Sequence, residues 1–131
     1  MTRIRPKVLL IDDEPDVRFA VSLLLRLRGM DVIEAESGEN GIVLARTACP
    51  TLIVSDIRLS GMDGFAMYDH LQKNPETKKI PVIFITGWAD TWKVSDHIKQ
   101  GGTVIGKPFN IQILMAAVTA SLSSKIDSPR V

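Results

Sequence analysis

The 131-residue sequence lacks three features that would place it in a specialised class of protein. Its single cysteine, Cys49, excludes a disulfide framework and is consistent with a reducing compartment. Its net charge of only +1 gives no strong field to attract nucleic acid or an anionic membrane. The N-terminal MTRIRPK lacks the apolar core of a secretion signal, and the following VLLI is far too short to span a bilayer. We therefore expect a cytoplasmic protein with no direct nucleic-acid or membrane partner.

The sequence also has no repeat, no low-complexity run and no linker that would separate two domains. Its length suits one domain, large enough to bury a core without disulfides. We expect an N-terminal extension over residues 1–6, one domain over 7–123 and a flexible C-terminal tail over 124–131.

Short apolar runs rich in Val, Ile and Leu alternate with longer segments of helical spacing. The runs predict strands at Lys7–Ile11, Asp31–Ala35, Leu52–Ser55, Pro81–Ile85 and Thr103–Ile105. The intervening segments predict helices from Pro15 to near Gly29, at Glu39–Ala48, at Gly64–Gln72 capped by Asp63, at Asp90–Lys99, and at Ile111–Leu122 capped by Asn110. This alternation predicts an α/β fold, in which a doubly wound parallel five-stranded sheet carries helices on both faces.

Chemically active side chains follow four of the five predicted strands. Asp12 and Asp13 follow the first strand, Asp56 the third, Thr86 the fourth and Lys107 the fifth. Because the carboxyl ends of parallel strands meet at one edge of the sheet, where ligands of such folds bind, we expect these side chains to converge.

The crowded acids in LLIDDEPD need an explanation, because carboxylates that close repel one another. A bound cation would remove that repulsion, and carboxylate oxygens are suitable ligands for Mg²⁺. An aspartate can also act as a nucleophile toward phosphorus, while a lysine and a threonine can hold the transferred group. The set is therefore suited to phosphoryl transfer.

In this arrangement the chain resembles the response regulator receiver domains of bacterial two-component signalling. The resemblance rests on Asp12-Asp13, on Asp56, on the SGMDG loop at Ser60–Gly64, on Thr86 and on the KPF motif at Lys107–Phe109. It extends over roughly residues 7–122. It implies a flavodoxin-like (βα)5 fold with strand order 2-1-3-4-5, as in single-domain chemotaxis regulators.

The resemblance also implies a role for each of these residues. Asp56 would accept a phosphoryl group from a sensor histidine kinase or phosphotransfer protein. Mg²⁺ would be bound by Asp13, Asp56 and the backbone carbonyl of Arg58, with Asp12 acting through a water. Lys107 would pair with the phosphoryl oxygens, and Thr86 would hydrogen-bond to them and carry the switch.

A switched surface would then form from the helix at Asp90–Lys99, the fifth strand and the last helix, and would contact a downstream protein. The chain would be a monomer or a phosphorylation-dependent dimer. It would not be an enzyme with a separate substrate, but a protein that assists its own phosphorylation and dephosphorylation.

One position departs from the family's usual pattern. The family commonly has an aromatic residue three positions before the lysine, whereas this sequence has Val104. The readout of phosphorylation is therefore expected to be partial or different.

Other functions remain open from the residues alone. The acids at positions 12–14 would also suit a helix N-terminus. A phosphatase could use an aspartate and Mg²⁺ on a similar sheet, although such enzymes place the nucleophile in a D-x-D pattern after the first strand. A degenerate receiver would bind partners without phosphorylation, and the chain could be the receiver of a longer regulator.

Overall fold

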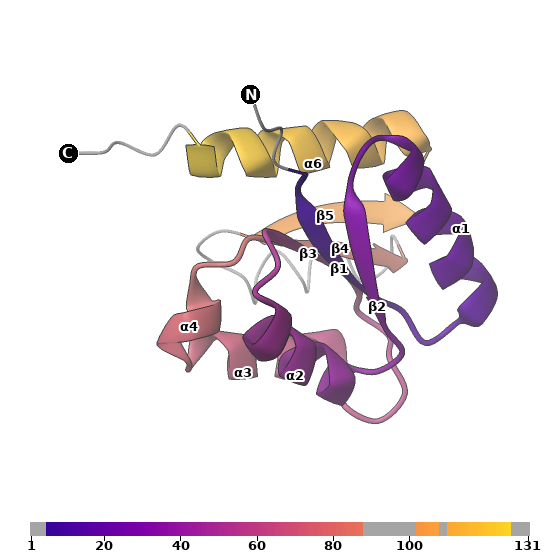
Figure 1. The fold of residues 1–131 in the computed structure, drawn as a ribbon. Coiled ribbons are helices and arrows are strands. Elements are labelled where there is room, and N and C mark those ends of the chain that lie inside the picture. The colour runs from indigo at the N-terminus through magenta and orange to yellow at the C-terminus, as the bar shows by residue number, and fades with distance from the viewer. Residues whose placement is uncertain (1–4, 88–101, 108–109, 127–131) are drawn as a thin grey trace.

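The computed structural model describes residues 5–87, 102–107 and 110–126 of the chain (Figure 1). Its elements are β1 (Lys7–Ile11), α1 (Pro15–Leu27), β2 (Asp31–Ala35), α2 (Gly38–Ala48), β3 (Leu52–Asp56), α3 (Gly64–Gln72), α4 (Pro75–Lys78), β4 (Val82–Gly87), β5 (Gly102–Lys107) and α6 (Ile111–Ile126). No helix among the described residues is both long enough and apolar enough to cross a membrane.

The five strands form one parallel sheet in the order β2-β1-β3-β4-β5, which confirms the expected fold. From β1 the chain winds outward to β2, and from β3 it winds the other way to β5. The direction changes between β1 and β3, so the carboxyl ends of these two central strands flank the switch point at which such sheets bind ligands.

The first two strands have the predicted bounds, but the other three extend further toward the site. β3 includes Asp56, which pairs with Ile85, and β4 and β5 continue until Gly87 pairs with Lys107. The predicted strands were too short because the apolar sequence pattern ends before these positions. The backbone pairing continues through the polar residues that follow. Asp56 and Lys107 are therefore held by the sheet itself.

Local capping sets the start of several helices. Asp63 caps α3 as predicted, its carboxylate accepting the Ala66 N–H at 2.9 Å, and Asn110 accepts the Ile113 N–H at 2.9 Å at the start of α6. α2 begins one residue earlier than predicted, behind Ser37. The short helix α4 was not predicted, and α6 continues to Ile126, past the expected end near Leu122. The predicted helix at Asp90–Lys99 lies outside the described residues.

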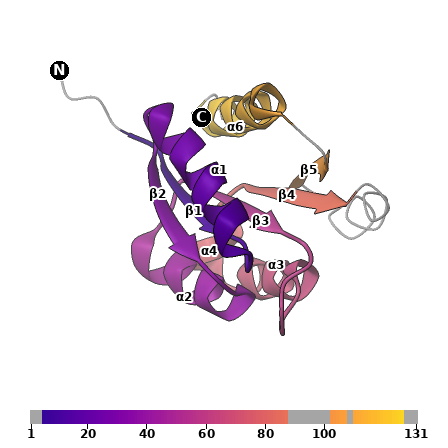
Figure 2. The same ribbon diagram turned by 90° about the vertical axis from the view of Figure 1, so that its right-hand side faces the viewer.

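Helices cover both faces of the sheet (Figure 2). On one face α2, α3 and α4 pack over alternate strand residues, and on the other face α1 and α6 do so. The first core contains Leu9, Ile11, Ile53, Met67, Leu71 and Phe84. The second contains Val8, Leu10, Leu25, Val54, Ile83 and Leu114. With its central strands buried on both faces, the sheet is a rigid support for its polar edge.

Candidate functional site

Asp56 lies at the centre of the polar edge, as the last residue of β3. It is buried, and both oxygens of its carboxylate are hydrogen-bonded. Oδ1 accepts the backbone N–H of Arg58 at 3.1 Å. Oδ2 accepts from the Nζ of Lys107 at 2.9 Å, across the intervening strand β4. The structure thus joins two residues that the sequence separates by 51 positions.

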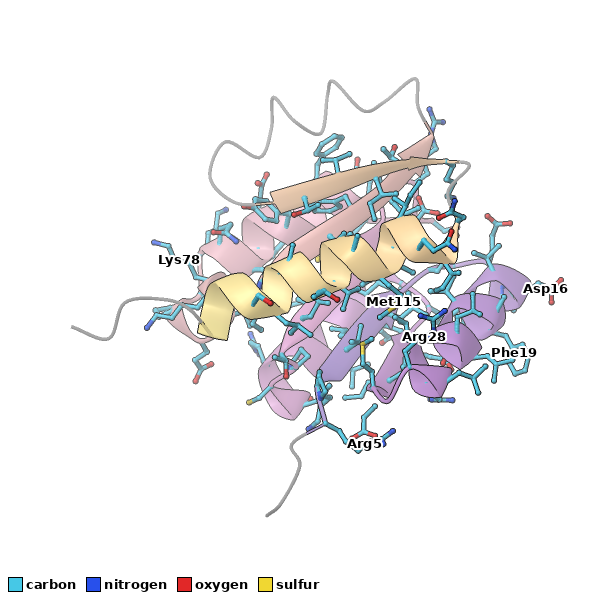
Figure 3. The ribbon with its side chains drawn as sticks, turned by 90° about the horizontal axis from the view of Figure 1, so that it is seen from above. Arg5, Asp16, Phe19, Arg28, Lys78 and Met115 are labelled. Carbon is cyan, nitrogen blue, oxygen red and sulfur yellow. The ribbon has the colours of Figure 1, made fainter. Side chains whose placement is uncertain are left out.

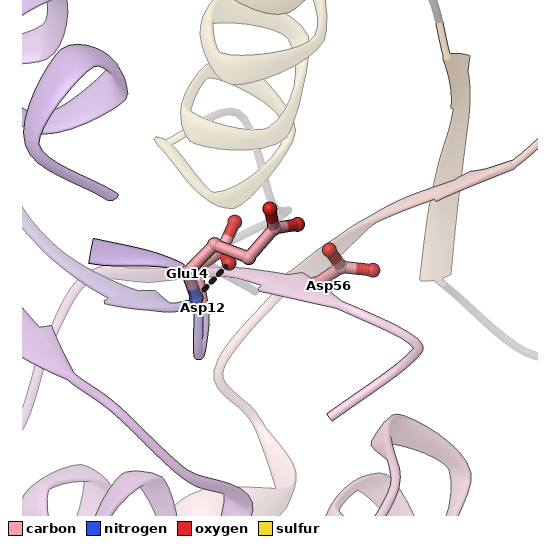
Figure 4. A group of neighbouring side chains, drawn as sticks. All are labelled: Asp12, Glu14 and Asp56. Atoms are coloured by element: carbon pink, nitrogen blue, oxygen red, sulfur yellow. Dashed lines mark hydrogen bonds between the residues drawn. The ribbon is translucent and has the colours of Figure 1, made fainter. Parts of the chain in front are cut away.

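Two further acids lie beside Asp56. Asp12, Glu14 and Asp56 each offer a carboxylate oxygen, and these oxygens lie within 4.8 Å of one another (Figure 4). The Asp12 side chain also accepts the backbone N–H of Glu14 at 2.9 Å, which turns the chain so that both carboxylates face Asp56. Glu14 is the N-cap residue of α1, yet its side chain makes no capping hydrogen bond. Helix capping therefore does not explain its position.

Burial and charge act together on the titration of this cluster. Burial raises the pKa of Asp12, and the charges of Asp56 and Glu14 raise it further; the hydrogen bond from the Glu14 N–H and the charge of Lys107 offset only part of this. Burial alone would lower the pKa of Lys107, but its hydrogen bond to Asp56 and the surrounding carboxylates more than compensate, and its pKa is raised. The site therefore holds a protonated lysine and an excess of negative charge.

That donor set fits a divalent cation. Asp12, Glu14 and Asp56 supply three hard oxygen donors within 4.8 Å of one another. The pKa of Asp12 is raised first by burial and then by the charges of Asp56 and Glu14. The three carboxylates together carry more negative charge than one lysine neutralises. Mg²⁺ is typically bound by one or two carboxylates with waters and phosphate oxygens, and this cluster supplies carboxylates of that kind.

Asp13 lies differently from its neighbours. Its Oδ2 accepts two hydrogen bonds from Ser60, one from the backbone N–H at 2.9 Å and one from the hydroxyl at 2.8 Å. Asp13 thus connects the turn after β1 to the loop after β3, and its oxygens are not among the three that cluster. Glu14 is present there instead, and the sequence reasoning did not include Glu14 as a ligand. The only sequence signal was its place in the run of three acids.

Thr86 lies at the same edge, in β4, next to Ile85, which pairs with Asp56. Its side chain is fully buried, and its hydroxyl has no hydrogen-bond partner within the part of the chain that the structure describes. A buried hydroxyl without a hydrogen-bond partner is energetically unfavourable. The Thr86 hydroxyl is therefore available to form a hydrogen bond with a ligand.

The loop after Asp56 is held by close contact with α3. The Gly64 N–H donates to the Ile57 carbonyl at 2.8 Å. A Cβ at position 64 would lie 2.9 Å from the Ile57 Cα and 3.0 Å from the Asp56 carbonyl oxygen. The last glycine of the SGMDG loop therefore permits the helix to approach the strand end that carries Asp56.

Val104 pairs with Phe84 in the sheet and is partly buried against the core that α2 and α3 cover. The position that is usually aromatic in the family therefore contributes only the small side chain of a valine to the packing of this core.

A buried carboxylate at the switch point of a five-stranded parallel sheet, beside a lysine and two further acids, defines a class of phosphoacceptor-like α/β domains. A comparison with protein families is consistent with this class: the model of the response regulator receiver domain matches residues 8–119. The chain belongs to this family.

The chain is similar to curated relatives of two kinds. It is 31% identical to the protein PilH of Pseudomonas aeruginosa over 118 residues, which cover 89% of this chain and 98% of that protein. It is 32% identical to a probable chemotaxis protein CheY of Rhizobium etli, covering 87% of this chain and 90% of the other. It is 33% identical to the DNA-binding dual master transcriptional regulator RpaA of Synechocystis, covering 89% of this chain and 49% of that protein. The chain thus spans about half the length of several relatives it matches.

Solved structures agree with the fold. A response regulator receiver domain protein from Clostridium thermocellum superposes with a TM-score of 0.85 at 25% identity, covering 92% of this chain and 97% of that one. The chemotaxis response regulator CheY4 of Vibrio cholerae superposes with a TM-score of 0.83 at 26% identity, covering 91% and 100%.

Proposed function

We propose that this receiver domain accepts a phosphoryl group on Asp56 from the phosphohistidine of a sensor kinase or phosphotransfer protein. The observation that carries the proposal is the pairing of buried Asp56 with Lys107 at 2.9 Å, beside two further carboxylates. A structural salt bridge would not need the additional acids, which repel Asp56 in the absence of a cation.

The chain's own groups have distinct tasks in this reaction. A carboxylate oxygen of Asp56 attacks the phosphorus, a P–O bond forms, and the P–N bond to the donor histidine breaks with its electron pair remaining on the imidazole. Lys107 offsets the charge of the phosphoryl oxygens, and the unpartnered Thr86 hydroxyl donates to one of them. The backbone N–H of Arg58 holds the attacking carboxylate in place.

A bound Mg²⁺ would neutralise phosphoryl and carboxylate charge at this edge. The ligands proposed from the resemblance are Asp12, Asp13, Asp56 and the Arg58 carbonyl. The clustering of Asp12 with Asp56 supports two of them, while Asp13 would have to exchange its hydrogen bonds with Ser60 for a place in that cluster. Glu14 is then a further candidate ligand.

Phosphorylation would be read out by a protein partner. The proposed surface comprises β5, α6 and the segment 90–99, the last of which lies outside the described residues. The structural effect of the added charge at Asp56 would reach β5 through a movement of Thr86. Val104 would then change its packing less than an aromatic ring at the same position would. In this proposal the domain acts in the cytoplasm as a monomer or a phosphorylation-dependent dimer, with a protein rather than nucleic acid or membrane as its target.

The test is Mg²⁺-dependent phosphorylation followed by intact mass. Purified protein is incubated with a small-molecule phosphodonor, with and without Mg²⁺, beside the variants Asp56→Asn and Asp31→Asn. We expect the wild type and Asp31→Asn to gain one base-labile phosphoryl group, because Asp31 lies at the amino-terminal end of β2, away from the site. Asp56→Asn should gain none.

The same assay with a phosphorylated histidine phosphotransfer domain covers donors that require protein recognition. If the wild type gains no phosphoryl group from either donor, the chain instead acts as a phosphorylation-independent binding module, the alternative for which Val104 leaves room.

A further inference from the structure

The acids that follow β1 do not act as one group. Asp12 and Glu14 face Asp56 (Figure 4). Neither oxygen of Asp13 belongs to the cluster that these three carboxylates form. Asp16, the last acid of the run, is exposed and points outward from α1 (Figure 3). Asp13 thus lies between two members of the cluster in the sequence and yet is bonded elsewhere.

Ser60 occupies one whole oxygen of the Asp13 carboxylate. Its backbone N–H donates to Oδ2 at 2.9 Å, and its hydroxyl donates to the same oxygen at 2.8 Å. A carboxylate oxygen has two lone pairs, so both of those on Oδ2 are in use. Oδ2 is therefore blocked as a ligand for a cation while the two hydrogen bonds are present.

The loop that carries Ser60 is held in place by contacts that do not involve Asp13. Leu59 is buried in the core that α2 and α3 cover, and Met62 packs against the same core. Between them, Gly61 has a φ of 75°, a left-handed conformation that glycine adopts without strain. The two donors of Ser60 therefore stay where they are when Asp13 turns away, and they continue to attract its carboxylate.

We propose that Ser60 sets the Mg²⁺ affinity of this site by competing with the cation for Asp13. The inference rests on the proposed function, in which Asp13 is a ligand of Mg²⁺. Asp13 joins the cluster only when its side chain turns away from Ser60 and both hydrogen bonds break. Ser60 is thus a positioning residue that acts through Asp13. The same exchange releases the loop after β3 from the turn after β1, so the two loops are joined only in the cation-free state.

Mg²⁺ titration of two matched variants measures this competition. Threonine and valine have nearly the same shape, but only threonine keeps a hydroxyl, so Ser60→Thr and Ser60→Val differ in the donor alone. Ser60 is exposed, which leaves room for the added methyl groups. Ser60→Val should lower the Mg²⁺ dissociation constant by about three- to tenfold relative to Ser60→Thr, because one of the two competing hydrogen bonds is lost. Ser60→Thr should bind Mg²⁺ as the wild type does.

Amide NMR spectra of the wild type follow the same exchange without any substitution. An amide proton that is bonded to a carboxylate resonates downfield, so the Ser60 amide proton should move upfield as Mg²⁺ is added. The Ala66 amide is the matched control, because it donates at 2.9 Å to Asp63, a carboxylate outside the cluster. Its resonance should stay in place.

Equal Mg²⁺ dissociation constants in Ser60→Val and Ser60→Thr would overturn the inference, and so would a Ser60 amide proton that does not move upfield. Weaker binding in Ser60→Val would overturn it too, because Ser60 would then support Asp13 as a ligand. A wild type that binds no Mg²⁺ would also overturn it.

Phosphorylation of Asp56 is followed separately, by intact mass of the wild type at a saturating Mg²⁺ concentration. A wild type that gains its phosphoryl group, while the two Ser60 variants bind Mg²⁺ equally, would refute the role of Ser60 and leave the proposed function intact. Tighter Mg²⁺ binding in Ser60→Val, without any phosphoryl group on the wild type, would instead support the competition and refute the proposed function.

Discussion

Replacing Asp12 with asparagine should make the protein more stable when no divalent cation is present. The Asp12 oxygen lies within 4.8 Å of oxygens of both Asp56 and Glu14. Two like unit charges about 4.8 Å apart repel by about 3–4 kcal/mol at an effective dielectric constant of about 20. Lys107 offsets part of this repulsion through its ion pair with Asp56. We therefore expect Asp12→Asn to raise the free energy of unfolding by about 1–2 kcal/mol.

Asparagine is the right substitution because it keeps the local turn. Its side-chain oxygen can still accept the Glu14 N–H, as the Asp12 Oδ1 does at 2.9 Å. The assay is urea unfolding at pH 7 in chelator, followed by circular dichroism. Glu36→Gln, which removes an exposed acid outside the cluster, is the control and should change the free energy of unfolding by less than about 0.5 kcal/mol.

Adding Mg²⁺ should reduce or reverse the difference. A ligand at about 100 times its dissociation constant stabilises the folded state by about 2.7 kcal/mol. The wild type should gain more than Asp12→Asn, because the variant has lost one carboxylate donor.

The pH dependence has a definite sign. The pKa of Asp12 is raised in the folded state above its ordinary value of 3.8, so the folded chain binds more protons than the unfolded chain in that range. The wild type should lose stability relative to Asp12→Asn as the pH rises from 3.8 through the raised pKa, and the difference should then level off. If Asp12→Asn is no more stable than the wild type in chelator at pH 7, the repulsion among the clustered carboxylates is already compensated without a cation. That result would refute the reasoning.

Three further substitutions test the surroundings of the site. Gly64→Ala should destabilise the protein by about 1–3 kcal/mol in urea unfolding, since the new Cβ would lie 2.9 Å from the Ile57 Cα; an unchanged midpoint would contradict the close contact. Thr86→Val should leave the unphosphorylated protein as stable or up to about 1 kcal/mol more stable, because it removes a buried hydroxyl without a described partner; a large loss of stability would show that the hydroxyl is satisfied. Arg18→Ala should weaken Mg²⁺ binding severalfold in calorimetric titration, because the guanidinium joins the Asp12 carbonyl at 2.8 Å to Glu34 at 3.1 Å. Equal affinities would show that the acidic turn needs no such support.

The resemblance indicated which residues matter, but the geometry of the acids required the structure. Asp13 and Glu14 are neighbours of the same charge, and nothing local decides which one joins Asp12 beside Asp56. The decision comes from Ser60, which lies 47 residues away in sequence and takes Asp13 into two hydrogen bonds. The turn that directs Glu14 inward is set by its own N–H bonding to Asp12.

The alternation of strands and helices could be predicted from the amino-acid sequence, because a central strand that is buried on both faces is a continuous apolar run. The caps at Asp63 and Asn110 could be predicted too, because they depend on side chains only three residues from the backbone groups they satisfy. The extent of β3, β4 and β5 and the set of carboxylates that meet could not be predicted in this way. Those features depend on pairing between distant segments, such as Asp56 with Lys107 across 51 positions, and local periodicity carries no information about such contacts.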